Sequence, residues 1–391
     1  MIKRDLENQL FLHCTKLNQD TESLSYIFNL LNQSIDWKYT LRLSSRHHLR
    51  LLMYWTLRRF ASSIPPDIME HLDAIFHYSI KRNLYLKGHL QTIVNAFHEC
   101  RIPIMQYKGL VLADTLYPNS VLRESADLDF LIQKEDAWKA KSLLKELNYE
   151  CDVSNLTEKE KEIYLSFERD LGFYHKESGV VVDLQWEVNR RTTLAKFNYD
   201  DLWDKSFAIS LQGSKILVPS HEYLLVILCI HGTKHGWQRL KWLYDVHRLI
   251  LLYKDIDWDE VWTITEAIRC KRMIYIALFL LQDLFGDELH KEVVKNVASD
   301  RSVKTISQTL KACMFKIGSK EAPGIRFQTK LLQIKSREKL IDKIRSMLGM
   351  GLFPNRDDYF AILPRSLKFL YSVYRPLRLL KDAFCSWAAR P

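Results

Sequence analysis

The sequence contains little glycine and proline, with 12 and 10 residues respectively among 391. It also has no low-complexity tract. Because these two residue types interrupt regular backbone structure, their scarcity favours long helices over a loop-rich or disordered architecture. Apolar residues make up 47% of the chain and charged residues 27%, a balance typical of globular proteins with a sizeable core.

Paired cysteines and long apolar runs are also missing. The seven cysteines are scattered and form no Cys-x-x-Cys pair, which argues against a disulfide framework and a thiolate zinc site. No run approaches the roughly eighteen uncharged apolar residues that a membrane-spanning helix needs. The first residues, MIKRDLENQLFLHC, mix both signs of charge and contain no apolar segment typical of a signal peptide. We therefore expect a cytoplasmic protein without a transmembrane segment.

The chain is basic, with a formal net charge of +10 and an isoelectric point near 9.1. Such a balance favours anionic partners, which include nucleotides, nucleic acids, acidic lipid surfaces and phosphorylated substrates. The basic residues are spread along the chain, so the charge alone does not choose among these partners.

Hydrophobic periodicity divides the chain into three regions. Residues 1–100 place apolar residues at three- and four-residue spacing, which predicts helices, and Pro65-Pro66 should open the longest of them. Residues 101–218 alternate short strands with helices and end in a hairpin. Residues 219–391 return to helical patterning. The expected fold is α+β, a small mixed-sheet core flanked by N-terminal and C-terminal helical regions.

Two aspartates stand at the start of one predicted strand. Asp127 and Asp129 flank Leu128 in the segment ADLDFLI. Alternate side chains of a strand point to the same side, so both carboxylates emerge on one face. A divalent cation relieves the repulsion between them, and hard oxygen ligands favour Mg²⁺ or Mn²⁺ over zinc. The triplet alone is a weak signal, because many strand ends carry two solvated aspartates.

A third carboxylate strengthens this interpretation. Asp183 lies within the apolar run VVVDLQWEV, where an isolated charge would be costly. If that strand lies beside LDFLI, the three acids converge at one edge of the sheet. Carboxylates arranged in this way can hold two metal ions that clamp an in-line phosphoryl displacement.

These segments resemble an uncharacterised bacterial nucleotidyltransferase family of the DNA polymerase β-like superfamily. The similarity is carried by YKGLVLADTLYPNSVLRESADLDFLI and VVVDLQWEV, and it continues in HGTKHGWQRLKWLYDVHRL and in the tail segment FPNRDDYFAILPRSLKFLYSVYRPLRLLK. The resemblance implies NTP-dependent transfer of a nucleotidyl group, with Asp127, Asp129 and Asp183 as ligands of Mg²⁺ or Mn²⁺.

The resemblance also implies a nucleotide-binding role for the residues before the acids. Lys108 and Gly109 stand where the superfamily has its phosphate-binding turn, whose N–H groups face phosphate. Arg123 is expected either to reach a phosphate or to order the loop. Gln185 departs from the pattern, because the family often has histidine at this position.

Two histidines four residues apart lie on a predicted helix. With the nearby basic residues, we expect His231 and His235 to face the cleft and contact phosphate or the acceptor. Lys234 and His235 are thereby assigned to nucleotide binding, and Asp245 is a candidate to orient one of these groups. The alternative is a helix whose polar face is simply solvated. No H-E-x-x-H arrangement supports a zinc hydrolase.

Four aromatic residues of the same region are candidates for stacking a base: Trp186, Trp237, Trp242 and Tyr244. Among them, Trp242 is expected to pack in the core. The pair His47-His48 in SSRHHLRLL is interpreted as part of a basic helix surface without a chemical role.

The C-terminal segment around Arg375, Arg378 and Lys381 is basic and amphipathic. Docking on an anionic membrane surface is one interpretation, but a helix folded back on the protein is favoured, because stable membrane binding takes more than one signal.

The favoured function is transfer of a nucleoside monophosphate from an NTP, such as ATP, to an unidentified acceptor with release of pyrophosphate. The acceptor classes left open are a sugar phosphate, another metabolite, a peptide or protein side chain, and an RNA end. One alternative is a non-catalytic nucleotide-binding or interaction module on the same fold. Another is an RNA-directed modifier, which is suggested by the net charge of +10.

Overall fold

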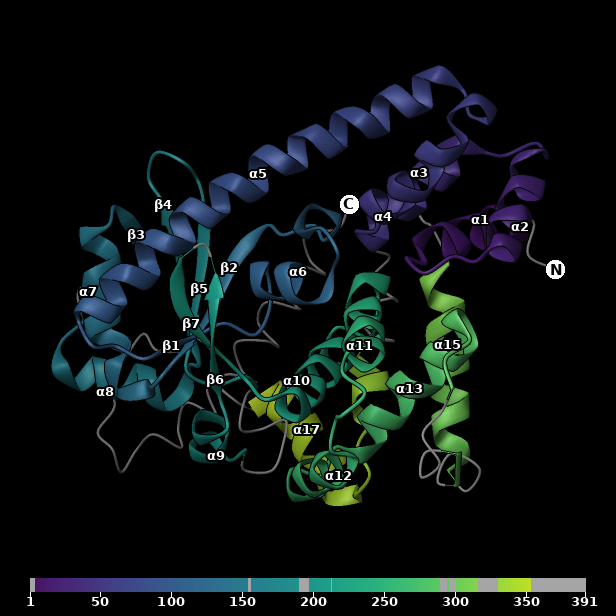
Figure 1. Ribbon diagram of the computed structural model, residues 1–391. Helices are drawn as coiled ribbons and strands as arrows, with labels where there is room; N and C mark the ends of the chain where they lie inside the picture. The colour runs from purple at the N-terminus through teal and green to yellow at the C-terminus, as the bar shows by residue number, and fades with distance from the viewer. Residues whose placement is uncertain are drawn as a thin grey trace, which may run out of the picture.

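A computed structural model describes residues 4–153, 156–189, 197–211, 213–288, 294–295, 300–315 and 330–352. A seven-stranded mixed sheet has helices on either side of it in the sequence, and the predicted α+β fold is confirmed (Figure 1). No helix of these residues is both long and apolar enough to cross a membrane. The tail segment with Arg375, Arg378 and Lys381 lies outside the described residues.

The N-terminal region is helical, as its periodicity predicts. Its elements are α1 (Asp5–Thr15), α2 (Thr21–Leu31), α3 (Trp37–His47), α4 (Arg50–Leu57), the short η1 (Arg58–Ser63) and α5 (Pro66–Glu99). Pro66 occupies the first turn of α5, where its missing N–H costs no helical hydrogen bond. The 34 residues of α5 run from the other N-terminal helices to the sheet (Figure 1).

All seven strands fall between Ile104 and Val218, in the order β3-β4-β5-β2-β1-β7-β6. They are β1 (Ile104–Met105), β2 (Asp127–Ile132), β3 (Tyr149–Cys151), β4 (Asp170–His175), β5 (Val181–Gln185), β6 (Phe207–Leu211) and β7 (Ser214–Val218). The helices between them are α6 (Leu110–Leu116), η2 (Ser120–Leu122), η3 (Lys134–Asp136), α7 (Ala137–Glu146), α8 (Glu158–Phe167) and α9 (Tyr199–Asp204). β6 and β7 form the predicted hairpin, whereas β3, α8 and α9 were not predicted.

After the sheet the chain is helical again. The elements are α10 (His221–Lys234), α11 (Leu240–Leu252), α12 (Trp258–Ala267), α13 (Lys271–Phe285), α15 (Arg301–Met314) and α17 (Leu340–Leu352). His231 and Asp245 lie on separate helices, because the chain leaves the helical conformation between Lys234 and Leu240, where Gly236 and Trp237 have positive φ angles of 58° and 49°.

The buried side chains form two clusters. One covers the sheet and contains residues of α5 and α7, including Leu90 and Leu144. The other joins the N-terminal helices to the C-terminal helices, so that Leu10 and Leu52 share a core with Leu243. The two ends of the described chain therefore pack as one helical unit, with α6 of the central region buried in it.

His47 links these helices, and its interpretation as a surface residue is wrong. The side chain is fully buried. Its Nδ1 accepts a hydrogen bond from the Leu240 N–H at 3.1 Å, so Nε2 carries the proton and donates to the Met314 carbonyl oxygen at 3.2 Å. Burial and the neighbouring Arg46 lower the pKa of His47 to about 3. The imidazole is thus a neutral bridge between α3, the start of α11 and α15.

This bridge predicts loss of stability in acid. In unfolded chains the pKa of histidine is about 6.5, so between pH 6.5 and 3 the unfolded state binds a proton that the folded state excludes. The contribution of His47 to the free energy of unfolding is complete above pH 6.5. It is lost as the pH falls, and the free energy of unfolding then decreases by up to about 1.4 kcal/mol per pH unit. Urea unfolding of wild type and His47→Gln from pH 7.5 to 4 measures this. Parallel stability curves for the two proteins would contradict it.

Candidate active site

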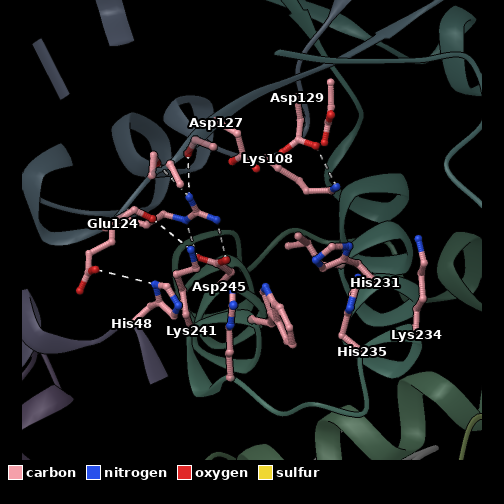
Figure 2. A pocket seen from close by; sticks show the side chains of 18 of the residues that line it. His48, Lys108, Glu124, Asp127, Asp129, His231, Lys234, His235, Lys241 and Asp245 are labelled. Atoms are coloured by element: carbon pink, nitrogen blue, oxygen red, sulfur yellow. Dashed lines mark hydrogen bonds and ion pairs between the residues drawn. The ribbon is translucent and has the colours of Figure 1, made fainter. Parts of the chain in front are cut away.

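A cavity of about 580 Å³ opens beside the sheet. The cavity is lined by the α3–α4 junction, the turn after β1, the segments around β2 and β5, the residue before β4, and the α10–α11 region (Figure 2). Its acidic lining residues are Glu124, Asp127, Asp129, Asp183 and Asp245. Its basic lining residues are His48, Arg50, Lys108, Arg123, Arg169, His231, Lys234, His235, Arg239 and Lys241. The eight site residues predicted from the sequence all line this cavity: Asp127, Asp129, Asp183, Lys108, Gly109, Arg123, Lys234 and His235.

The three aspartates meet because β2 and β5 are adjacent and parallel. Asp129 is the register partner of Asp183, and Asp127 lies two residues earlier on β2. Side chains of paired residues share a face of the sheet, so the three carboxylates lie on the cavity side. Leu128 and Phe130 are fully buried on the opposite face, which fixes the register.

Grouping three carboxylates has an electrostatic cost. Burial and the Asp129 charge raise the pKa of Asp127. Burial, Asp129 and Asp127 together raise the pKa of Asp183 to about 6. A set of carboxylate oxygens that destabilise one another fits a hard divalent cation such as Mg²⁺ or Mn²⁺. Among the residues described, however, no three His, Cys, Asp or Glu side chains are gathered closely enough to form a finished metal site.

Lys108 and Gln185 hold Asp129 in place. The Lys108 ammonium lies 3.3 Å from Asp129 Oδ1, and the Gln185 Nε2 donates to the same oxygen at 3.2 Å. The Oε1 of Gln185 accepts a hydrogen bond of 2.6 Å from the buried Tyr107 hydroxyl. Burial alone would lower the pKa of Lys108, but Asp129 and Tyr107 raise it above its ordinary value. Gln185 thus connects Asp129 to the buried Tyr107.

Gly109 forms the turn that follows Lys108. Its φ of 65° and ψ of −128° are accessible to glycine but not to residues with a Cβ, and the turn leads into α6. Its carbonyl oxygen accepts a hydrogen bond from Arg123 Nη1 at 2.9 Å. Because Arg123 is 5% exposed and its other donors are also engaged, its contacts favour ordering of the loop over direct contact with phosphate.

Asp245 is the main partner of Arg123. The guanidinium forms two bonds to the Asp245 carboxylate, of 2.8 and 2.9 Å, and the Tyr117 hydroxyl donates to Asp245 Oδ1 at 2.8 Å. Asp245, the candidate to orient one of the histidines or nearby basic groups of the cleft, instead binds Arg123 and Tyr117 through its carboxylate oxygens. This ion pair fastens α11 to the loop before β2.

His231 and His235 line the cavity as expected, with Trp242 between them and Arg239. The His231 and His235 ring centres lie 5.4 and 5.0 Å from that of Trp242, and the Arg239 guanidinium lies 5.5 Å from it. Burial and neighbouring lysines lower the pKa of His235 to about 4 and that of His231 well below its usual range. Both rings are neutral near pH 7, so they contribute hydrogen-bonding atoms rather than charge.

Trp242 is the aromatic residue that faces the cavity. Its expected packing in the core is confirmed in part, since the side chain is partly buried against the hydrophobic core, and it also lines the pocket. The other candidates for base stacking, Trp186, Trp237 and Tyr244, are buried. Helical spacing alone does not predict which of these rings is buried and which faces the cavity, because that depends on the break in the helix between Lys234 and Leu240.

Trp237 requires a glycine on the preceding helix. A Cβ added at Gly232 would lie 2.3–2.5 Å from three Trp237 ring atoms. We expect Gly232→Ala to lower the unfolding free energy by about 2–4 kcal/mol, because the fully buried indole has to move. Gly88→Ala in α5 is the matched control: its Cβ meets no atom within 4 Å, and it should gain about 0.5–1 kcal/mol. Chemical denaturation measures both, and equal effects would refute the clash.

Four residues important to the cavity were not assigned to the site from sequence: His48, Arg50, Glu124 and Arg169. His48 ends α3 with a left-handed backbone, φ 54°, and Arg50 begins α4. Glu124 accepts two hydrogen bonds from Arg50, of 2.7 and 3.2 Å. Basic residues at a helix junction are a common surface pattern, so no local signal predicted that this junction would line the same cavity as the three aspartates.

A family model described as "Uncharacterised nucleotidyltransferase" matches residues 33–286. The match takes in the sheet and the cavity, and it begins within the N-terminal helices that supply His48 and Arg50. The resemblance of the tail falls outside the matched residues. No curated protein and no solved structure matches the chain.

Proposed function

The chain belongs to the uncharacterised nucleotidyltransferase family, and from this premise we propose that it is a Mg²⁺-dependent enzyme that uses an NTP. It would transfer the nucleoside monophosphate to an acceptor hydroxyl and release pyrophosphate. The observation that carries this proposal is the pairing of Asp129 with Asp183 across parallel strands, with Asp127 on the same face. Three acids on one wall of a basic cavity suit a cation and a triphosphate together.

Asp127, Asp129 and Asp183 are the residues that would hold Mg²⁺ or Mn²⁺. When bound, the ion would supply positive charge at the transferring phosphoryl group and lower the pKa of the acceptor hydroxyl. Gln185 and Tyr107 keep the Asp129 carboxylate oriented through the hydrogen bonds that join them.

The triphosphate would lie along Lys108, Lys234 and His235. Lys108 supplies charge and Gly109 allows the backbone to approach phosphate closely. Arg123 fixes this turn through its bond to the Gly109 carbonyl oxygen. Trp242 offers an aromatic face at the same cavity. Binding energy in such a site positions the α-phosphorus in line with the acceptor oxygen.

The alternatives are less well supported. A non-catalytic module would gain nothing from grouping three carboxylates, an arrangement in which burial and the acidic neighbours raise the pKa of Asp127 and of Asp183. An RNA-directed modifier would need a basic surface leading to the acids, and the basic residues found here line a cavity within the size range of small-molecule sites.

Transfer of label tests the proposal. Purified protein is incubated with each α-³²P-labelled NTP, Mg²⁺ and a cell extract as the source of acceptor, beside Asp127→Ala/Asp129→Ala. Label that moves to an acceptor with the wild type and not with the variant supports the enzyme. If no NTP gives transfer or metal-dependent binding, the non-catalytic module is favoured instead.

A further inference from the structure

Eight of the ten basic side chains of the cavity fall into two groups, which include neither Arg123, the partner of Asp245, nor Arg169. The nucleotide lobe contains Lys108, His231, Lys234 and His235. The second lobe contains His48, Arg50, Glu124, Arg239 and Lys241. Figure 2 shows His48, Glu124 and Lys241 on one side and His231, Lys234 and His235 on the other. Trp242 contacts members of both groups, His235 at 5.0 Å and Arg239 at 5.5 Å between centres.

The second lobe has more positive than negative charge. Glu124 is its one carboxylate, and Arg50 already binds both of its oxygens. His48 lies 3.7 Å from Glu124, but burial, Lys241 and Arg239 lower the pKa of His48 to about 4, so it is neutral. Arg239 and Lys241 thus add two cations that Glu124 does not compensate.

Lys241 is the more buried of these two uncompensated cations. Its ammonium donates to the Glu124 carbonyl oxygen at 3.0 Å, and within the described ranges no carboxylate lies within 4.0 Å of it. Burial and the Arg123 charge lower the pKa of Lys241 to about 8. An anionic group bound here would receive hydrogen bonds from a cation that is already desolvated, which makes such bonds strong.

The second lobe is also adjacent to the acids. Lys241 and Asp127 lie close enough for each charge to shift the pKa of the other. A molecule anchored by Lys241 and Arg239 can therefore present a neighbouring hydroxyl at the carboxylates, opposite a triphosphate in the nucleotide lobe.

We propose that the second lobe binds an anionic group of the acceptor, a phosphate ester or a carboxylate, so that the acceptor is a small anion bearing a hydroxyl. This inference rests on the proposed nucleotidyl transfer. The acceptor oxygen forms a bond to the α-phosphorus, and the bond from that phosphorus to the oxygen bridging the β-phosphorus breaks. Pyrophosphate leaves with the electron pair, and the hydroxyl proton passes through a site carboxylate to solvent.

The test separates the two lobes by calorimetric titration of the full-length protein. ATP with Mg²⁺ probes the nucleotide lobe, and inorganic phosphate, added with and without ATP and Mg²⁺, probes the second. The variants are Lys241→Met and the exposed Arg239→Gln, with Lys234→Met for the other lobe and the exposed Lys254→Met as a neutral control. Thermal unfolding of each variant checks its fold, and Arg239→Gln keeps the test valid if Lys241→Met is unstable.

We expect phosphate to bind the ATP-loaded wild type. Lys241→Met should weaken this binding about 10-fold or more and Arg239→Gln about 3-fold, as for loss of one charge-assisted hydrogen bond. ATP affinity should stay within about twofold in both variants and fall only in Lys234→Met. Malonate titrated in place of phosphate then decides between a carboxylate and a phosphate ester.

Other results overturn the proposal. If Lys241→Met weakens ATP as much as Lys234→Met does, the second lobe holds the triphosphate. If phosphate and malonate do not bind the wild type, or bind all variants equally, the lobe is not an anion site. Loss of binding to a short single-stranded RNA in Lys241→Met, without binding of phosphate, would indicate a nucleic-acid acceptor. If the wild type binds no ATP but its phosphate site needs Lys241, the transferase proposal fails and the anion site stands.

Discussion

Asp183→Asn is expected to abolish nucleotidyl transfer and, at the same time, to stabilise the metal-free protein. Loss of one carboxylate from the proposed metal site removes several kcal/mol of transition-state stabilisation, so the rate should fall by about 10³-fold or more. The fold should gain stability, because in the wild type burial, Asp129 and Asp127 raise the pKa of Asp183 from 3.8 to about 6. The folded state thus disfavours the charged form that prevails at neutral pH.

The sign of the pH dependence follows from that shift. Between about pH 4 and 6 the folded wild type holds a proton on Asp183 that the unfolded chain releases, so its stability falls as the pH rises through this window. The asparagine variant lacks this loss. Its advantage should grow from pH 4 to 6 and level off above pH 6 at about 1–3 kcal/mol, with solvent screening favouring the lower end.

Thermal and urea unfolding in EDTA at pH 5 and 8 measure the stability, and the labelled-NTP assay measures the transfer. Asp255→Asn, at an exposed loop position, is the matched control and should change neither. A variant that is less stable than the wild type at pH 8 without metal would show that the three carboxylates do not repel one another as the structure indicates.

Breaking the Arg123–Asp245 pair should be the most destabilising charge substitution. Arg123 and Asp245 are 5% and 1% exposed in their side chains, and Arg123→Met leaves the Asp245 carboxylate buried without its cation. We expect a loss of about 3–5 kcal/mol in the unfolding free energy. The double variant Arg123→Met/Asp245→Leu should recover most of it, because no unpaired charge remains in the core.

Activity should respond differently from stability. The double variant lacks the bond from Arg123 to the Gly109 carbonyl oxygen, so the turn before α6 loses its anchor and transfer stays low. A double-mutant cycle by urea unfolding, combined with the transfer assay, tests both parts. Lys161→Met removes the exposed ion pair with Glu158 and should cost less than about 1 kcal/mol. A comparable cost for Arg123→Met would refute the role of the buried pair.

The sequence was sufficient for features that depend on local pattern. Short apolar runs located the strands with Asp129 and Asp183, and helical spacing with Pro65-Pro66 located the start of α5. The predicted convergence of the acids needed one further condition, that the two strands be neighbours, and the structure meets it. The division at residues 100 and 218 stays a prediction, although all strands lie between these limits.

Features that depend on distant partners could not be predicted in this way. Arg123 and Asp245 are 122 residues apart, and no local spacing relates them. His47 looks like a surface histidine in a basic segment, and its burial depends on Leu240 and Met314. β3 has three residues, too few for its alternation to stand out from the flanking loops. Tertiary contacts decide these positions.

Because α1 and α4 share one hydrophobic core with α10 to α13, the strand-bearing segment is not an interchangeable module. A fragment of residues 101–218 alone would lack the parts of the cavity wall that carry His48 and Lys241. It would also expose the apolar side of α6 to water. Gene fusion or recombination that transplanted this segment alone would move the three aspartates without the basic groups around them. Diversification of specificity is therefore expected to proceed by point substitution at the α3–α4 and α10–α11 junctions, with the whole matched region inherited as a unit.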